Sequence, residues 1–186
     1  MGKRVYFHFR GSEVRRMTPF NRLNPFNWDK DLSRIEENSK EYSDAIKQLP
    51  YKFNEEDQYK FTKRIKNIVT EVFVTDAETQ IFAPNATIVP RVVDERLFEI
   101  GKERIENGSQ EKNKFFTIVH APTRPFFKGT PYVLKAIKNL TDAGYKIKLD
   151  IITGEENQVV LNKCQKADLV IDQLKIGWYG VFTVEN

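Results

Sequence analysis

Two basic side chains in a stretch that contains proline and glycine are the clearest candidates for chemistry. Arg124 and Lys128 lie four residues apart, and Gly129 follows directly. Arginine presents a planar fork of donors and lysine a compact positive charge, and both suit phosphate oxygens. Glycine lets the backbone approach a ligand closely. The combination predicts a diphosphate site, with an ordinary surface loop as the alternative.

A second unusual loop lies near the end of the sequence, where two glycines flank two aromatic residues in residues 177–180 (GWYG). The aromatic rings either stack on the sugar or base of a ligand or pack the loop against the protein. Asp172 precedes this loop at the end of an expected strand. It either contacts a sugar or caps the loop.

The sequence lacks the motifs of several other common kinds of site. The sequence contains no GxGxxG, no GxxxxGK[ST] and no GxSxG motif, so dinucleotide, P-loop and nucleophile-elbow sites are not indicated. With two histidines and one cysteine, it offers no metal-ligand cluster. The lone cysteine also excludes an intramolecular disulfide and fits a reducing compartment.

The composition indicates a folded chain whose small positive charge says little about its ligands. Of the 186 residues, 40% are hydrophobic and 30% charged, which is enough apolar material for a core. The net charge of +4 permits an anionic ligand but does not argue for nucleic acid. No apolar run approaches the roughly 20 residues of a membrane span, and the start does not resemble a signal peptide. We expect a cytoplasmic protein, with the inner face of a membrane as a peripheral alternative.

The second half of the chain alternates strands with helices. The expected strands are residues 115–120, 146–152 and 169–171, and the expected helices are 131–143 and 155–166, separated by loops that include 121–130. This alternation indicates βαβ units and a parallel sheet. Ligands bind such a sheet beyond the carboxyl ends of its strands.

The first half predicts a smaller set of elements. The expected strands are residues 5–9, 71–74 and 87–89, with an ordered loop at 17–30 and a loosely helical segment at 32–49. Residues 55–69 are expected to form an amphipathic helix that buries Phe61, Ile65, Ile68 and Val69. Thr75-Asp76 is expected to form the N-cap of a brief helical turn.

Residues 115–186 resemble the donor-binding domain of GT-B-type glycosyltransferases of the group 1 (family 4) class, which use nucleotide-sugar donors. The matching segments are residues 120–130 (HAPTRPFFKGT), 167–174 (ADLVIDQL) and 177–185 (GWYGVFTVE). Residues 67–94 and the turn at residues 10–15 resemble parts of the acceptor-binding domain of the same class.

The resemblance implies an α/β chain with partial GT-B architecture, built from two incomplete Rossmann-like parallel-sheet domains. Residues 1–94 would form the C-terminal part of the acceptor-side domain. Residues 95–114 would be a linker, and residues 115–186 the first half of the donor-binding domain.

The implied activity is transfer of a sugar from a nucleotide-diphosphate sugar to an unknown acceptor, either a glycan or a lipid-linked molecule. Arg124 and Lys128 would stabilise the leaving diphosphate. The implied donor-binding residues are Gly129, Asp172, Gly180 and Glu185, and the implied acceptor-side loop is Arg10, Gly11 and Ser12. No metal ion or other cofactor is expected, because basic residues take the metal's place in this class.

Three departures from the class stand out. Arg10 occupies the position of a histidine at the reaction centre, and Gly177 occupies the position of the first carboxylate of a Glu-x7-Glu motif that Glu185 completes. The sequence also ends at Asn186, inside the expected domain. We therefore expect a chain truncated at both ends, with self-association through its incomplete sheets.

Three interpretations remain open from the sequence. The chain is a glycosyltransferase or its fragment, an inactive remnant that serves as a nucleotide-binding module, or a basic α/β interaction domain for nucleic acid or an anionic membrane surface. The first two predict a nucleoside diphosphate preference that depends on Arg124 and Lys128. The third predicts steep loss of binding with salt and no nucleotide preference.

Overall fold

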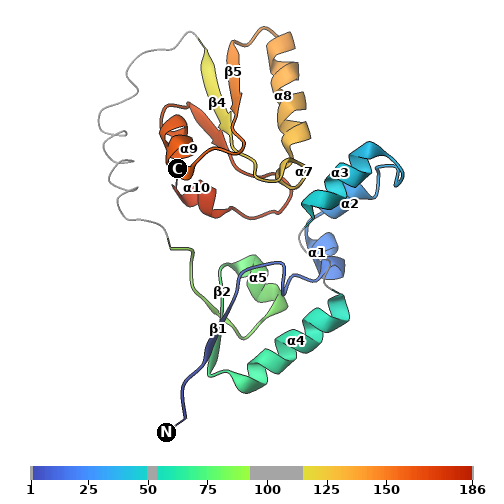
Figure 1. The fold of residues 1–186 in the computed structure, drawn as a ribbon, viewed down its shortest axis with the longest axis vertical. Coiled ribbons are helices and arrows are strands. Elements are labelled where there is room, and N and C mark those ends of the chain that lie inside the picture. The colour runs from blue at the N-terminus through green and yellow to red at the C-terminus, as the bar shows by residue number, and fades with distance from the viewer. Residues whose placement is uncertain (1, 50–53, 93–114, 186) are drawn as a thin grey trace. The chain divides into compact units, whose positions relative to one another are not determined.

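Two compact units make up the part of the chain that the computed structural model describes, residues 2–49, 54–92 and 115–185. Unit 1 contains residues 2–25, 49 and 54–92, and unit 2 contains residues 26–48 and 115–185. Each unit holds its own three-stranded parallel sheet (Figure 1). The chain is therefore mixed α/β with two small parallel sheets, which confirms the predicted α/β fold class.

The sheet of unit 1 has the strand order β1-β2-β3. Its strands are β1 (Tyr6–Phe9), β2 (Glu71–Val74) and β3 (Thr87–Ile88). Phe9 pairs with Val74, and Val74 pairs with Ile88, so the three strands end together at one edge. The expected strands at these positions are confirmed, to within a residue at their ends.

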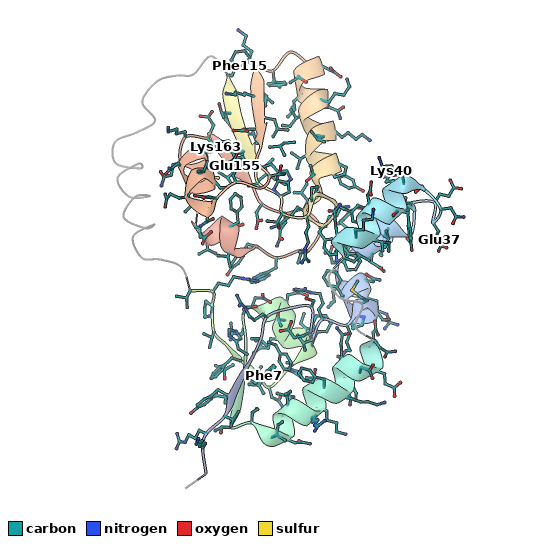
Figure 2. All side chains as sticks on the ribbon, viewed as in Figure 1. Phe7, Glu37, Lys40, Phe115, Glu155 and Lys163 are labelled. Carbon is teal, nitrogen blue, oxygen red and sulfur yellow. The ribbon has the colours of Figure 1, made fainter. Side chains whose placement is uncertain are left out.

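Aromatic and branched side chains fill the core of unit 1. Its helices are α1 (Met17–Leu23), α4 (Glu55–Ile68) and α5 (Ala77–Phe82). Phe9 and Phe20 are almost completely buried and pack with Phe82. Phe7, labelled in Figure 2, packs edge-on against Phe61 of α4, with ring centroids 5.9 Å apart. These contacts hold α4 against β1.

The side chain of Asp76 caps α5, as predicted. One of its carboxylate oxygens accepts a hydrogen bond from the backbone N–H of Thr79 at 2.7 Å and another from the Thr79 hydroxyl at 2.7 Å. Burial disfavours the charged carboxylate, but the hydrogen bonds from Thr79 and Thr75 outweigh this and lower the pKa of Asp76.

The predicted helix over residues 55–69 is confirmed as α4, and part of its predicted apolar face is buried: Ile65 lies in the core and Val69 packs against it. Phe61 and Ile68 are 41% and 64% exposed, whereas the helix buries Gln58, Thr62 and Ile65. The Gln58 side-chain amide donates to the carbonyl oxygen of Ser12 at 2.7 Å. The Thr62 hydroxyl donates to the carbonyl oxygen of Gln58. Because these hydrogen bonds satisfy the Gln58 amide N–H and the Thr62 hydroxyl, polar side chains occupy a face that apolar periodicity alone does not reveal.

The sheet of unit 2 has the strand order β5-β4-β6. Its strands are β4 (Phe116–His120), β5 (Ile147–Ile151) and β6 (Leu169–Ile171). Helix α8 (Thr130–Asp142) connects β4 to β5, and α9 (Asn157–Cys164) connects β5 to β6. The predicted alternation of strands and helices is confirmed here.

A small core joins the sheet of unit 2 to α9. It consists of Val119, Ile152, Cys164 and Ala167. Burial, with a contribution from the charge of Asp150, raises the pKa of the Cys164 thiol to about 11. The thiol is therefore protonated at neutral pH and packs as a small apolar group.

Two segments predicted as loops contain short helices. Residues 17–30 hold α1 and the start of α2 (Trp28–Leu32), and residues 121–130 hold α7 (Pro125–Lys128). The side chain of Asn27 caps α2, and Pro125 occupies the first turn of α7. Proline and asparagine therefore begin helices here rather than form loops.

The compact units divide the chain differently from the predicted domains at one place. Residues 26–48, which contain α2 and α3 (Lys40–Gln48), group with unit 2 rather than with the rest of residues 1–94. In Figure 1, α2 and α3 lie beside α7. The predicted linker, residues 95–114, lies outside the described residues.

Candidate anion-binding site at the edge of the second sheet

The candidate site lies where the three strands of unit 2 end. His120, the last residue of β4, pairs in register with Ile151 at the end of β5 and with Ile171 at the end of β6. The loops after these strands therefore leave the sheet at the same edge (Figure 1). This is the edge at which open α/β sheets bind ligands.

Asp172 is the centre of the hydrogen bonds at this edge. Its Oδ1 accepts from Nζ of Lys128 at 2.5 Å. Its Oδ2 accepts from the backbone N–H of Gly180 at 2.7 Å and from the hydroxyl of Thr183 at 2.7 Å. An ammonium, an amide N–H and a hydroxyl thus surround one carboxylate. In this structure Asp172 caps the loop before α10 (Val181–Glu185), which is one of the two roles expected for it.

The surroundings of Asp172 keep its carboxylate charged. Burial disfavours the charged form, but the hydrogen bonds from Lys128 and Thr183 and the charge of Lys128 outweigh burial, so the pKa of Asp172 lies below its ordinary value. Lys128 and Asp172 therefore form a charged pair at neutral pH, with side chains only 17% and 10% exposed.

His120 is fully buried behind this pair and has a structural role. Its Nδ1 lies 2.8 Å from the carbonyl oxygen of Ile171, and its Nε2 lies 2.8 Å from the hydroxyl oxygen of Thr130. A carbonyl only accepts, so Nδ1 carries the proton and Nε2 of the neutral ring accepts from Thr130. Burial lowers the pKa of His120, and the nearby charge of Lys128 lowers it further. The ring therefore ties β4 to the end of β6 and to the start of α8.

Two glycines of the site are required by close packing. Gly129 has φ +79°, and a Cβ there would lie 3.0 Å from Cβ of Leu174. A Cβ on Gly180 would lie 2.8 Å from Oδ2 of Asp172. Glycine at position 180 therefore lets the Asp172 carboxylate reach the backbone N–H.

Two other predicted residues stand apart from this network. Arg124 precedes α7 and is exposed, and it forms no ion pair within the described ranges. Its guanidinium is therefore open to an anion from solvent. Glu185 is half-buried at the end of α10, with no hydrogen bond or ion pair to another described residue.

The loop between Asp172 and α10 is ordered by its own contacts. Trp178 stacks on Tyr179 with ring centroids 5.2 Å apart. The Gln173 side-chain amide donates to the carbonyl oxygen of Trp178. Tyr179 remains 43% exposed, and the buried indole N–H of Trp178 has no hydrogen-bond partner among the described residues. The loop thus offers an aromatic face and one free donor.

A pocket of about 380 Å³ borders Asp172. Asp172 and Thr183 line it together with Cys164 and residues 167–170. The carboxylate that binds Lys128 therefore also borders a hollow between β6, α9 and α10.

The turn expected on the acceptor side lies in unit 1, directly after β1. Gly11 has φ +147°, which favours glycine, and its carbonyl oxygen accepts from the backbone N–H of Arg15 at 2.9 Å. The Ser12 carbonyl oxygen accepts from the side chain of Gln58 at 2.7 Å. The Arg10 side chain is exposed. These contacts shape the turn, and its contact with an acceptor stays a prediction.

The sequence did not single out three residues that complete the site. Thr183 and Thr130 hydrogen-bond Asp172 and His120, and Lys175 is buried in the loop after β6. A threonine near the start of a helix that follows Asp172 is the signal that points to Thr183. No local signal marks Lys175, because its carboxylate partner, Asp31, lies far away in the chain.

Comparison of the chain with protein-family models, with curated proteins and with solved structures found no match. Within residues 2–49, 54–92 and 115–185, no helix has the length and apolar character to cross a membrane. The same residues contain no group of three His, Cys, Asp or Glu side chains suited to a metal ion.

Proposed function

We propose that unit 2 binds the diphosphate of a nucleotide sugar, and that the chain is a glycosyltransferase or a fragment of one. One observation carries the proposal: Nζ of Lys128, the N–H of Gly180 and the hydroxyl of Thr183 converge on one anionic group at the carboxyl edge of a parallel sheet. These three donors suit a phosphate as well as a carboxylate. The exposed Arg124, four residues before Lys128, adds a second cation in the same segment.

The donors have a clear part in glycosyl transfer. Negative charge grows on the leaving diphosphate as its bond to the sugar breaks. Fixed cations and N–H groups that neutralise this charge stabilise the transition state more than the ground state. Lys128 and Arg124 carry this role in the proposal, and Glu185 accepts hydrogen bonds from the ribose hydroxyls. The acceptor, a glycan or a lipid-linked molecule, is assigned to the turn of Arg10, Gly11 and Ser12.

A nucleotide-binding module without turnover is the second candidate. Two observations favour it: Asp172 already neutralises Lys128, and Gly177 supplies no carboxylate where the resembling class has one. Both candidates share the same binding site. They differ only in whether the bond between the diphosphate and the sugar is broken.

Release of nucleoside diphosphate separates the two candidates. The full chain is incubated with UDP-, GDP- and ADP-sugars, alone and with simple glycan acceptors, and free diphosphate is measured over time. A glycosyltransferase releases diphosphate from one donor, and Lys128→Ala slows the release about 100-fold. Lys135→Ala, the same change at an exposed lysine of α8, leaves it unchanged. Binding of a nucleotide without release identifies a module. Salt-sensitive binding with no nucleotide preference rejects both candidates.

A further inference from the structure

Lys175 is a charged residue buried in the loop that follows β6. Its side chain is only 6% exposed, and its Nζ forms an ion pair with Oδ2 of Asp31. The same Nζ lies 3.8 Å from the centre of the Tyr132 ring. An ammonium is costly to bury unless a carboxylate and other polar or aromatic groups compensate it. The pair with Asp31 therefore helps to hold this loop residue in place.

Asp31 connects two separate elements of unit 2. While Oδ2 pairs with Lys175, Oδ1 accepts a hydrogen bond from the hydroxyl of Tyr132 at 2.8 Å. Tyr132 belongs to the first turn of α8. Asp31 itself lies in α2, which the side chain of Asn27 caps. A single carboxylate thus joins residues 26–48 both to the loop after β6 and to α8.

The two ends of residues 26–48 also contact α7. Near one end, the ring of Trp28 lies 4.5 Å from the ring of Phe127, centroid to centroid. At the other end, Oε1 of Gln48 accepts from the backbone N–H of Phe126 at 2.9 Å. That N–H belongs to the first turn of a helix and has no partner within the helix. The turn with Glu37 and Lys40 is exposed and lies away from α7 (Figure 2).

These contacts reach the two elements that carry the candidate site. Helix α7 contains Lys128, and the loop after β6 begins with Asp172. The backbone N–H of Leu174 donates to the carbonyl oxygen of Lys128 at 3.1 Å, which joins the loop to α7 directly. Residues 26–48 therefore support Lys128 from one side and the loop of Asp172 from the other.

We infer that residues 26–48 are a strap that sets the geometry of the anion site, and that Asp31 is its positioning residue. Asp31 does not touch the ligand in this account. It acts through Lys175 and Tyr132 on the loop after β6. The effect on ligand affinity rests on the proposed function, whereas the effect on the loop does not.

Amide hydrogen exchange of the full chain tests the strap. The reporters are the amide of Leu174, which is bonded to α7, and the amide of Ile152, which is bonded to β4 and serves as the reference. In Asp31→Asn, Leu174 should exchange about tenfold faster, because a charged hydrogen-bond partner is lost, while Ile152 is unchanged. Asp44→Asn, the same change at an exposed position of α3, should leave both amides at the wild-type rate.

A double variant separates the loss of positioning from the cost of burying Lys175 without the charge of Asp31. Asp31→Asn with Lys175→Met removes both members of the pair, so no buried cation lacks its counter-charge. The strap predicts that Leu174 still exchanges faster than in the wild type. Wild-type exchange at Leu174 in folded Asp31→Asn, or its full restoration in the double variant, overturns the inference.

Tyr132→Phe covers the case in which Asp31→Asn does not fold. It keeps the ring beneath Lys175 and removes only the hydrogen bond to Asp31, so a smaller acceleration at Leu174 is expected. No acceleration there also overturns the inference. In parallel titrations with UDP, GDP and ADP, Asp31→Asn should weaken binding about tenfold. If the wild type binds none of them, the proposed function fails. The exchange data still decide whether residues 26–48 hold the loop after β6 in place.

Discussion

Nζ of Lys128 lies 2.5 Å from Oδ1 of Asp172, so the protein's own carboxylate holds the cation that the sequence assigns to a phosphate. The same carboxylate accepts from the N–H of Gly180 and the hydroxyl of Thr183. If unit 2 binds a diphosphate, as we propose, the ligand would meet donors that are already in place and would compete with Asp172 for them.

Replacing Asp172 by asparagine should strengthen the binding of a nucleoside diphosphate. Asp172→Asn removes the negative charge that competes for Lys128 and repels the ligand, and it keeps an acceptor oxygen for Gly180 or Thr183. We expect affinity to rise about tenfold in a calorimetric titration. Asp142→Asn, an exposed carboxylate on α8, is the matched control and should have no effect. Weaker binding in Asp172→Asn would show that the carboxylate supports the ligand instead.

Asp172 should also stabilise unit 2 in a pH-dependent way. Its pKa in the folded protein lies below the unfolded value of about 3.9. Its contribution is therefore fully present above about pH 5 and is lost as the pH falls through the folded pKa. Asp172→Asn should show a shallower loss of stability in acid. Both tryptophans, Trp28 and Trp178, lie in unit 2, so fluorescence-detected urea unfolding at a series of pH values measures this unit. Equal acid sensitivity in both proteins would contradict the assignment.

His120→Ala should destabilise unit 2 by about 3 kcal/mol, because it leaves a cavity and removes the partner of the Ile171 carbonyl and the Thr130 hydroxyl. His8→Ala, at the exposed histidine of β1, should change the free energy of unfolding of unit 1 by less than about 0.5 kcal/mol. Urea unfolding measures both, with circular dichroism added for unit 1. A small loss for His120→Ala would mean that the imidazole does not hold the strand ends together.

Gly180→Ala should disturb the site through steric contact. The added Cβ would lie 2.8 Å from Oδ2 of Asp172, so the carboxylate must move away from Lys128 or from the backbone N–H. We expect a loss of about 2 kcal/mol in stability of unit 2. Gly154 has φ +73°, and a Cβ added there would have no atom within 4 Å. Gly154→Ala therefore tests backbone strain alone and should lower the stability of unit 2 by about 1 kcal/mol. Equal losses in the two variants would argue against a tight approach of Asp172 to Gly180.

The sequence predicted elements whose signals are local. An apolar run placed β4, alternation of apolar residues placed β5, and a short apolar segment placed β6. Asp76 marked the start of α5 through the hydrogen bonds that a capping carboxylate makes. It also selected Lys128 and Asp172 as site residues. It did not predict that the two residues pair with each other, because their side chains meet only once β4 and β6 lie side by side.

Long-range polar contacts account for the features that the sequence did not predict. Gln58 is buried in α4 because the carbonyl oxygen of Ser12 accepts its hydrogen bond, and no period in the sequence records such a partner. Asp31 and Lys175 are far apart in the chain and individually resemble solvated charges. The grouping of residues 26–48 with unit 2 follows from contacts of this kind, so pattern and propensity did not reveal it.

A calorimetric titration of the full chain with UDP, GDP and ADP shows whether unit 2 binds a nucleoside diphosphate. We expect saturable binding of one nucleotide, loss of that binding in Lys128→Ala, and unchanged binding in Lys135→Ala. No binding of any of the three to a chain that melts cooperatively, or equal binding in Lys128→Ala, would contradict the proposed diphosphate site.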